Sequence, residues 1–251
     1  MKIAVSDLLF PGFRKFGIRP LNTEYGIEFF YEFGHDYYWD EETAVWGDRE
    51  FSIHGPCVAV DLADEANLNY LPAFEATFKY AQKINSQFVV VHTNECLPAD
   101  IKAGQELVIS RLAELLEMAQ KYGVTLVIEN VGLRSKGNVL FTLEEYYALF
   151  ERFPQAMSLI DTGHAHVNGW DIPAVVEKLG SKLFAFHIHD NDGNGDDHLP
   201  VWQGTIDWDE LFPAIKAHAP KAILVMEYCC GFENTTELEA HLAELKDKYE
   251  I

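Results

Sequence analysis

The feature that most constrains the fold is a regular alternation of short apolar runs with longer segments of helical periodicity. This alternation is typical of βα units, which build a parallel sheet. The runs are rich in Val, Ile and Phe, and eight of them are predicted to be strands: KIAVS from residue 2, YGIEFF from 25, FSIHG from 51, FVVVHT from 88, VTLVIEN from 124, MSLIDT from 157, LFAFHIH from 183 and AILVMEY from 222.

Helices are predicted in the segments between these runs. The clearest patterns span residues 70–84, 104–123, 142–153, 171–180, 207–218 and 237–249. Thr142 and Glu145 have the spacing of a capping box, which predicts a helix start at that point. Residues 10–24 and 35–50 are rich in Gly, Pro and aromatics and have the least defined pattern. Eight βα units predict an α/β fold, a single (βα)8 TIM-barrel domain over residues 1–251.

Charge and composition exclude several classes of protein. With 40 acidic and 19 basic side chains, the net charge is −21, which disfavours binding to a phosphate backbone. No apolar run approaches the roughly 18 residues that span a bilayer. The first residues lack a signal-peptide cleavage pattern, so we expect a cytoplasmic protein. Four cysteines without a CxxC pair predict neither a disulfide framework nor a finger-type zinc site.

Six consecutive predicted strands end in a side chain that can bind a metal or carry a proton. Active sites of such barrels lie at these strand ends. The six residues are His54, His92, Glu129, Asp161, His187 and Glu227. Because strand side chains alternate between faces, the residue two positions earlier shares the inward face. Those residues are small or apolar, as a barrel interior requires: Ser52, Val90, Val127, Leu159, Ala185 and Val225.

Carboxylates and histidines gathered at one mouth predict a divalent cation site. Mixed nitrogen and oxygen ligands suit Mn²⁺, Co²⁺, Zn²⁺ or Fe²⁺ better than Ca²⁺, and Mg²⁺ stays a candidate. A bound cation polarises a carbonyl oxygen, while carboxylates on two sides move a proton from one face of a carbon to the other. This chemistry fits a sugar isomerase, a ketose epimerase or a dehydratase of a polyol ketone.

Two loops are expected to extend the site. Asp161-Thr-Gly-His164 is predicted to turn through glycine and return His164 to the mouth, and Asp196 and His198 lie in a glycine-containing loop. The neighbouring polar residues are expected to be solvated or to support ligands: His166, His189, Asp190 and Asp192. Aromatic residues near predicted loops could shield a substrate, or pack in a lid or subunit interface: Phe10, Phe13, Phe16, Tyr37, Tyr38, Trp39, Trp46 and Trp202.

Four motifs make this chain resemble the xylose isomerase-like barrel superfamily. They are VIEN at 127–130, DTGHAH at 161–166, HIHDNDG at 187–193 and MEY at 226–228. Similarity to the epimerases of this group implies catalytic glutamates at 129 and 227 and substrate contact by His164. It also implies one cation held by Glu129, Asp161, His187 and Glu227. Those epimerases usually carry an arginine just beyond the residue matching His187, whereas this chain has no arginine after Arg152.

The endonuclease IV branch of the same superfamily binds three zinc ions through nine ligands, and this chain resembles it at every ligand position. Beyond the four residues of the epimerase set, the matching residues are His54, His92, His164, Asp196 and His198. These five are therefore predicted to bind either substrate or additional metal. The net charge argues against DNA, and Arg134 and Lys136 are the only basic candidates near the predicted mouth.

The preferred interpretation is a metal-dependent isomerase or epimerase of a small carbohydrate that carries no phosphate, without nucleic-acid or membrane partners. The alternatives are a dehydratase of a cyclic polyol ketone, a multi-zinc phosphodiesterase of the AP endonuclease type, and a barrel that binds carbohydrate without turnover. The sequence leaves open whether the chain forms a homo-oligomer.

Overall fold

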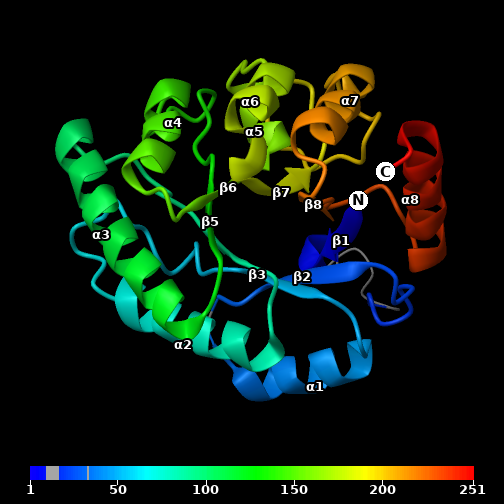
Figure 1. The fold of residues 1–251 in the computed structure, drawn as a ribbon, viewed down its shortest axis with the longest axis horizontal. Coiled ribbons are helices and arrows are strands. Elements are labelled where there is room, and N and C mark those ends of the chain that lie inside the picture. Colours follow the sequence, from blue (N-terminus) through cyan, green and yellow to red (C-terminus); the bar gives the residue numbers. More distant parts are fainter. Residues whose placement is uncertain (10–16, 33) are drawn as a thin grey trace.

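A computed structural model of the chain has a closed barrel of parallel strands at its centre, and it describes residues 1–9, 17–32 and 34–251 (Figure 1). Each strand pairs with its neighbours in sequence, and β1 pairs with β8 to close the ring. The strands are β1 (Lys2–Ser6), β2 (Gly26–Phe30), β3 (Phe51–His54), β4 (Val89–Val91), β5 (Leu126–Glu129), β6 (Met157–Asp161), β7 (Leu183–Ile188) and β8 (Ile223–Met226). The predicted α/β TIM barrel and its eight strands are confirmed.

Helices follow the strands and lie outside the barrel (Figure 1). They are α1 (Asp36–Trp46), α2 (Tyr70–Ile84), α3 (Ile101–Tyr122), α4 (Leu143–Arg152), α5 (Thr162–Val167), α6 (Ile172–Leu179), α7 (Trp208–His218) and α8 (Thr235–Tyr249). The predicted capping box at the start of α4 is present. Helix α3 begins earlier than predicted because the Asp100 carboxylate accepts a hydrogen bond from the Ala103 amide, which caps the helix there. The described residues also form two short 3-10 segments, η1 (Asp7–Leu9) and η2 (Gly180–Lys182).

The inside of the barrel is filled by a separate apolar cluster, which we call the lower layer. Its members are Ala4, Phe88, Val90, Val127, Leu159, Ala185, Ile223 and Val225. Five of them are the inward residues that the strand register predicts. Because side chains alternate along a strand, the next inward residue of each strand lies above this layer, at the mouth. The layer therefore forms the floor of the site.

Several aromatic side chains pack inside the protein instead of lining the mouth. On α1, the Trp39 ring stacks on Phe29 at a centroid distance of 4.4 Å, and Trp46 lies 5.9 Å from the same ring. Trp202 packs against Tyr249. For these three tryptophans, packing explains the aromatic character better than substrate shielding. Phe10, Phe13 and Phe16 lie outside the described residues.

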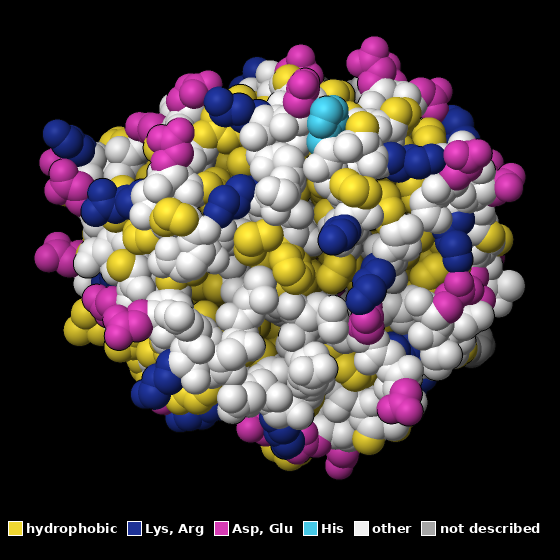
Figure 2. Space-filling view, viewed as in Figure 1, with side chains coloured by type: hydrophobic (Ala, Val, Ile, Leu, Met, Phe, Trp, Pro, Cys, Tyr) yellow, Lys and Arg dark blue, Asp and Glu magenta, His cyan; other side chains and the backbone are white. Residues whose placement is uncertain are grey.

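The surface carries both signs of charge. Figure 2 shows acidic and basic side chains interspersed around the edge of one face. Within the described ranges, none of the helices combines the length and apolar character that crossing a membrane requires.

Candidate active site

Four buried side chains form what we call the central group at the mouth of the barrel. Glu129 and Asp161 end β5 and β6, His187 lies near the end of β7, and Glu227 directly follows β8. Each of the four is at most 3% exposed. They come together because all the strands are parallel, so that their carboxyl ends meet at one end of the barrel.

The geometry of the central group suits a cation. The His187 Nδ1 atom lies 3.4 Å from Glu227 Oε2, 3.5 Å from Glu129 Oε2 and 3.9 Å from Asp161 Oδ2. This nitrogen is buried and has no hydrogen-bond partner among the described residues. A buried polar atom without a partner costs free energy, and three carboxylates around it repel one another. A divalent cation would remove both costs, so these residues fit a metal site.

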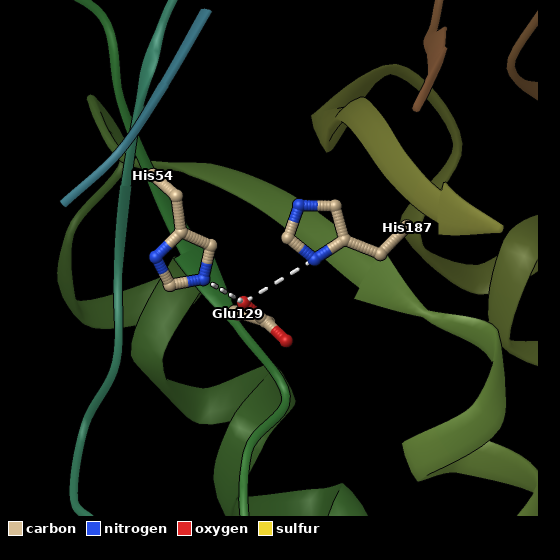
Figure 3. A group of neighbouring side chains, drawn as sticks. All are labelled: His54, Glu129 and His187. Atoms are coloured by element: carbon tan, nitrogen blue, oxygen red, sulfur yellow. Dashed lines mark ion pairs between the residues drawn. The ribbon is translucent and has the colours of Figure 1, made fainter. Parts of the chain in front are cut away.

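Two further histidines, one at the end of β3 and one directly after β4, approach Glu129. The His92 Nε2 atom lies 3.0 Å from Glu129 Oε2, and His54 Nε2 lies 3.7 Å from the same oxygen. Figure 3 shows His54 and His187 on two sides of this carboxylate. A single glutamate therefore contacts imidazoles from β3, β7 and the end of β4.

The loop after β7 and helix α5 together add an outer group of three side chains. The Asp196 carboxylate lies between His164, whose Nε2 is 3.3 Å from Oδ2, and His198, whose Nε2 is 3.4 Å from Oδ1. His164 also reaches inward, with Nδ1 3.3 Å from Glu129 Oε1. His198 Nδ1 donates a hydrogen bond to the Glu227 backbone oxygen at 2.9 Å. The structure thus brings all nine candidate residues of the sequence analysis to one mouth.

The segment that carries His164 is a helix rather than the predicted glycine turn. The Asp161 side chain caps α5 by accepting a hydrogen bond from the His164 amide at 2.6 Å. Gly163 is required here because a Cβ at that position would lie 1.9 Å from the His189 ring. In the space left free, His189 Nε2 lies 3.0 Å from both oxygens of Asp161.

The other polar residues of the β7 loop have diverse environments. His189 is fully buried, stacks on His198 at 4.1 Å and supports a carboxylate of the central group, which is one of the two roles predicted for it. Asp190 is also fully buried and accepts hydrogen bonds from the Trp208 ring and the Ile206 amide, so its role is structural. Asp192 is exposed, as predicted.

Two carboxylates at the mouth, the buried Glu28 and the half-buried Asp7, were missed by the sequence analysis. Glu28, in the middle of β2, receives a hydrogen bond from His187 Nε2 at 2.8 Å and another from Ser52 at 2.9 Å. Asp7 follows β1, and burial raises its pKa to about 8, with the charges of Glu28 and Glu227 adding to the effect. For Glu28, the sequence offered one signal, which is that it is the single acidic residue inside the apolar run YGIEFF.

Several carboxylates and histidines of the mouth shift one another's pKa values. Burial lowers the pKa of His92, but Glu129 and Glu95 outweigh it and raise the pKa to about 10. Burial also lowers the pKa of His187. The charges of Glu227, Glu28 and Glu129 outweigh burial and raise this pKa well above its usual value. Burial disfavours the charged form of Glu129, yet His92 and His187 hold its pKa well below the usual range.

Known proteins are similar to this chain over most of its length. Residues 49–248 match the family model described as xylose isomerase-like TIM barrel. The chain belongs to this family. It is 25% identical to the fructoselysine 3-epimerase of Escherichia coli O157:H7 over 167 residues, which cover 65% of this chain and 60% of that protein.

Solved structures of the same fold are also similar. A D-tagatose 3-epimerase-like protein has a TM-score of 0.78 and 21% sequence identity, covering 99% of both chains. The IOLI protein, solved with a zinc atom, has a TM-score of 0.76 and 18% identity, again covering 99% of both chains. The chain spans 69%, 27% and 52% of the first three curated relatives that it matches.

Proposed function

We propose that this protein is a divalent-metal-dependent isomerase or epimerase of a small sugar or polyol ketone. The observation that carries the proposal is the pair of buried glutamates, Glu129 and Glu227, which both face the Nδ1 atom of His187. Their carboxylate oxygens lie 3.5 and 3.4 Å from its Nδ1 atom. Strands β5 and β8 are not neighbours in the barrel, so the two carboxylates reach the mouth from different sides.

The central group would hold the cation. Glu129, Asp161, His187 and Glu227 offer three carboxylates and one imidazole, a set that suits Mn²⁺, Co²⁺, Zn²⁺ or Mg²⁺. When bound, the cation supplies Lewis acidity that polarises a substrate oxygen. The solved IOLI protein with its zinc atom supports a metal in this family.

The two glutamates are proposed to move the substrate proton. The low pKa keeps Glu129 ionised at neutral pH, so its carboxylate can accept a proton from a carbon beside the carbonyl group. Delivery of a proton by Glu227 to the other face inverts that carbon, which is an epimerisation, and the two glutamates then regain their starting states by proton exchange with solvent. Delivery to the former carbonyl carbon, with the hydroxyl proton passing to the former carbonyl oxygen, exchanges carbonyl and hydroxyl, which is an isomerisation.

Five remaining polar residues are proposed to bind substrate hydroxyls or additional metal ions: His54, His92, His164, Asp196 and His198. Each of the four histidines contacts a carboxylate of the mouth, and for His164 and His198 that carboxylate is Asp196. For a polyhydroxylated substrate, such groups supply both hydrogen-bond donors and acceptors. The fructoselysine 3-epimerase among the relatives supports a carbohydrate substrate.

Proton exchange in heavy water tests the two-base reaction. Ketoses and inososes are incubated with the Mn²⁺- or Co²⁺-loaded protein, and deuterium incorporation is followed by NMR. We expect Glu129→Gln and Glu227→Gln each to slow exchange by a factor on the order of 10² to 10⁴. Glu151→Gln, which changes an exposed glutamate of α4, is the matched control and should leave exchange unaltered. Undiminished exchange in both site variants would refute the proposal.

A multi-zinc phosphodiesterase is the second candidate, favoured by the outer group. His164, Asp196 and His198 provide a further set of ligand atoms beside the central group. Metal analysis of the purified protein distinguishes the two, with about one divalent ion per chain expected for the isomerase and up to three zinc ions for the phosphodiesterase. Tight, saturable binding of abasic duplex DNA at low salt would favour the second candidate, although the net charge of −21 opposes it.

A dehydratase of a cyclic polyol ketone would use the same proton abstraction but then lose water. The NMR screen separates it from an epimerase, because a dehydratase yields an unsaturated product from an inosose. A barrel that only binds carbohydrate would change NMR chemical shifts on binding but would not incorporate deuterium into the sugar.

A further inference from the structure

We propose that Glu28 is a positioning residue that holds the Nε2 atom of His187 and thereby directs Nδ1 at the central group. The inference rests on the proposed metal site, and it assigns a function to a carboxylate outside the candidate ligand set. Glu28 lies on β2 and His187 on β7, which are not neighbours in the barrel. The contact therefore crosses the interior of the mouth.

The geometry fixes the direction of the hydrogen bond. His187 Nε2 and Glu28 Oε1 are 2.8 Å apart, and both residues are fully buried. An ionised carboxylate can only accept, so the hydrogen of this bond resides on Nε2. The second oxygen of Glu28 accepts a hydrogen bond from the Ser52 hydroxyl at 2.9 Å, which restrains the carboxylate from its other side.

The consequence lies at the opposite nitrogen of the ring. With Nε2 occupied, Nδ1 is the atom that remains for a ligand, and it has no hydrogen-bond partner among the described residues. It faces Glu227 and Glu129 at 3.4 and 3.5 Å. A carboxylate behind a histidine orients the ring and increases the basicity of the other nitrogen, which strengthens metal binding.

The pair of His92 and Glu95 can be compared with the pair of His187 and Glu28, because in each a carboxylate contacts a histidine of the mouth. His92 Nδ1 lies 2.7 Å from Glu95 Oε1, but the Glu95 side chain is 40% exposed. Water can replace an exposed partner and screens its charge, whereas a buried partner has no substitute. Glu28 is therefore expected to matter much more for metal binding than Glu95.

Metal affinity and the state of the His187 ring test the proposal together. Mn²⁺ and Zn²⁺ dissociation constants are measured by chelator competition for the wild type, Glu28→Gln, Ser52→Ala and Glu95→Gln. From the usual effect of such supporting groups, we expect Glu28→Gln to weaken binding by roughly 10- to 100-fold. Ser52→Ala, which loosens Glu28 without removing it, should have an intermediate effect, and Glu95→Gln should change affinity less than about threefold.

Histidine-selective ¹⁵N NMR of the zinc-loaded protein supplies a readout independent of activity. We expect a slowly exchanging, hydrogen-bonded Nε2 proton on His187 in the wild type, and its shift or loss in Glu28→Gln. A folded Glu28→Gln protein with wild-type affinity and an unchanged His187 signal would overturn the proposal. The absence of a hydrogen-bonded Nε2 proton in the wild type would overturn it without recourse to any variant.

Failure of the proposed function gives a different result. If the wild type binds neither Mn²⁺ nor Zn²⁺, the metal site itself is refuted. If it binds metal, and Glu28→Gln weakens that binding, but no ketose or inosose exchanges deuterium, the positioning role stands while the reaction class is wrong.

Discussion

The lower layer and the central group lie on the same inward face of the same strands, two residues apart, yet they have opposite chemistry. Val127 precedes Glu129, and Leu159 precedes Asp161. Both groups are buried. The lower layer stabilises the fold by burying apolar surface, whereas the central group holds carboxylates that repel one another. Residues that stabilise the fold therefore lie only two positions along a strand from residues that are expected to perform the chemistry.

The largest effect on stability is expected from the lower layer. Leu159→Ala leaves a cavity under the site and should lower the free energy of unfolding by about 2–5 kcal/mol. Chemical denaturation measures this, and metal affinity should stay within about threefold of the wild type in the folded variant. A collapse of metal affinity in parallel with stability would mean that the two levels are not separable.

A change at Asp161, two residues after Leu159, should lower metal affinity and leave stability nearly unaltered. Asp161→Asn removes a proposed ligand charge, and we expect metal affinity to fall by about 100-fold, or about 2.7 kcal/mol. Stability of the metal-free protein should stay within about 1 kcal/mol, because asparagine also caps a helix such as α5. The same denaturation and chelator assays check both numbers. Unaltered affinity would remove Asp161 from the ligand set.

Added metal should bind at the central group and leave the lower layer unchanged. At a free Mn²⁺ concentration about 100 times the dissociation constant, the protein should gain about 2.7 kcal/mol of stability over the chelator-treated form. Affinity should also increase from pH 6.5 to pH 8. The pKa of His187, the histidine of the proposed ligand set, is raised well above its usual value, so its imidazole carries a proton that metal must displace. A flat pH profile would remove His187 from the ligand set.

The smallest effect is expected from a helix cap outside both levels. Thr142→Ala removes the capping box of α4 and should lower the free energy of unfolding by about 1 kcal/mol. Metal affinity should not change. A loss of affinity in this variant would show that the loop before α4 couples to the site.

The barrel and most of its mouth could be predicted because both depend on the two-residue period of a strand. That period identified the eight strands and placed His54, Asp161 and Glu227 at one end. Glu28 was missed because it lies inside β2 and not at its end, so its acidic side chain within an apolar run was the only signal, and its contact with His187 appears only in the structure. The helix at 162–167 was also missed, since its first turn depends on a cap from Asp161 that has no separate signal in the sequence.

The close approach of Gly163 to the His189 ring links two positions in evolution as well as in space. A side chain at 163 would need the volume that the imidazole occupies, since its Cβ would lie 1.9 Å from the ring. Position 163 therefore cannot gain a side chain while the ring is in place, whereas position 189 can change with the glycine retained. Family members with a larger residue at the position of Gly163 should have lost the ring at the position of His189, and an ancestor could have gained this histidine only on a background that already carried the glycine.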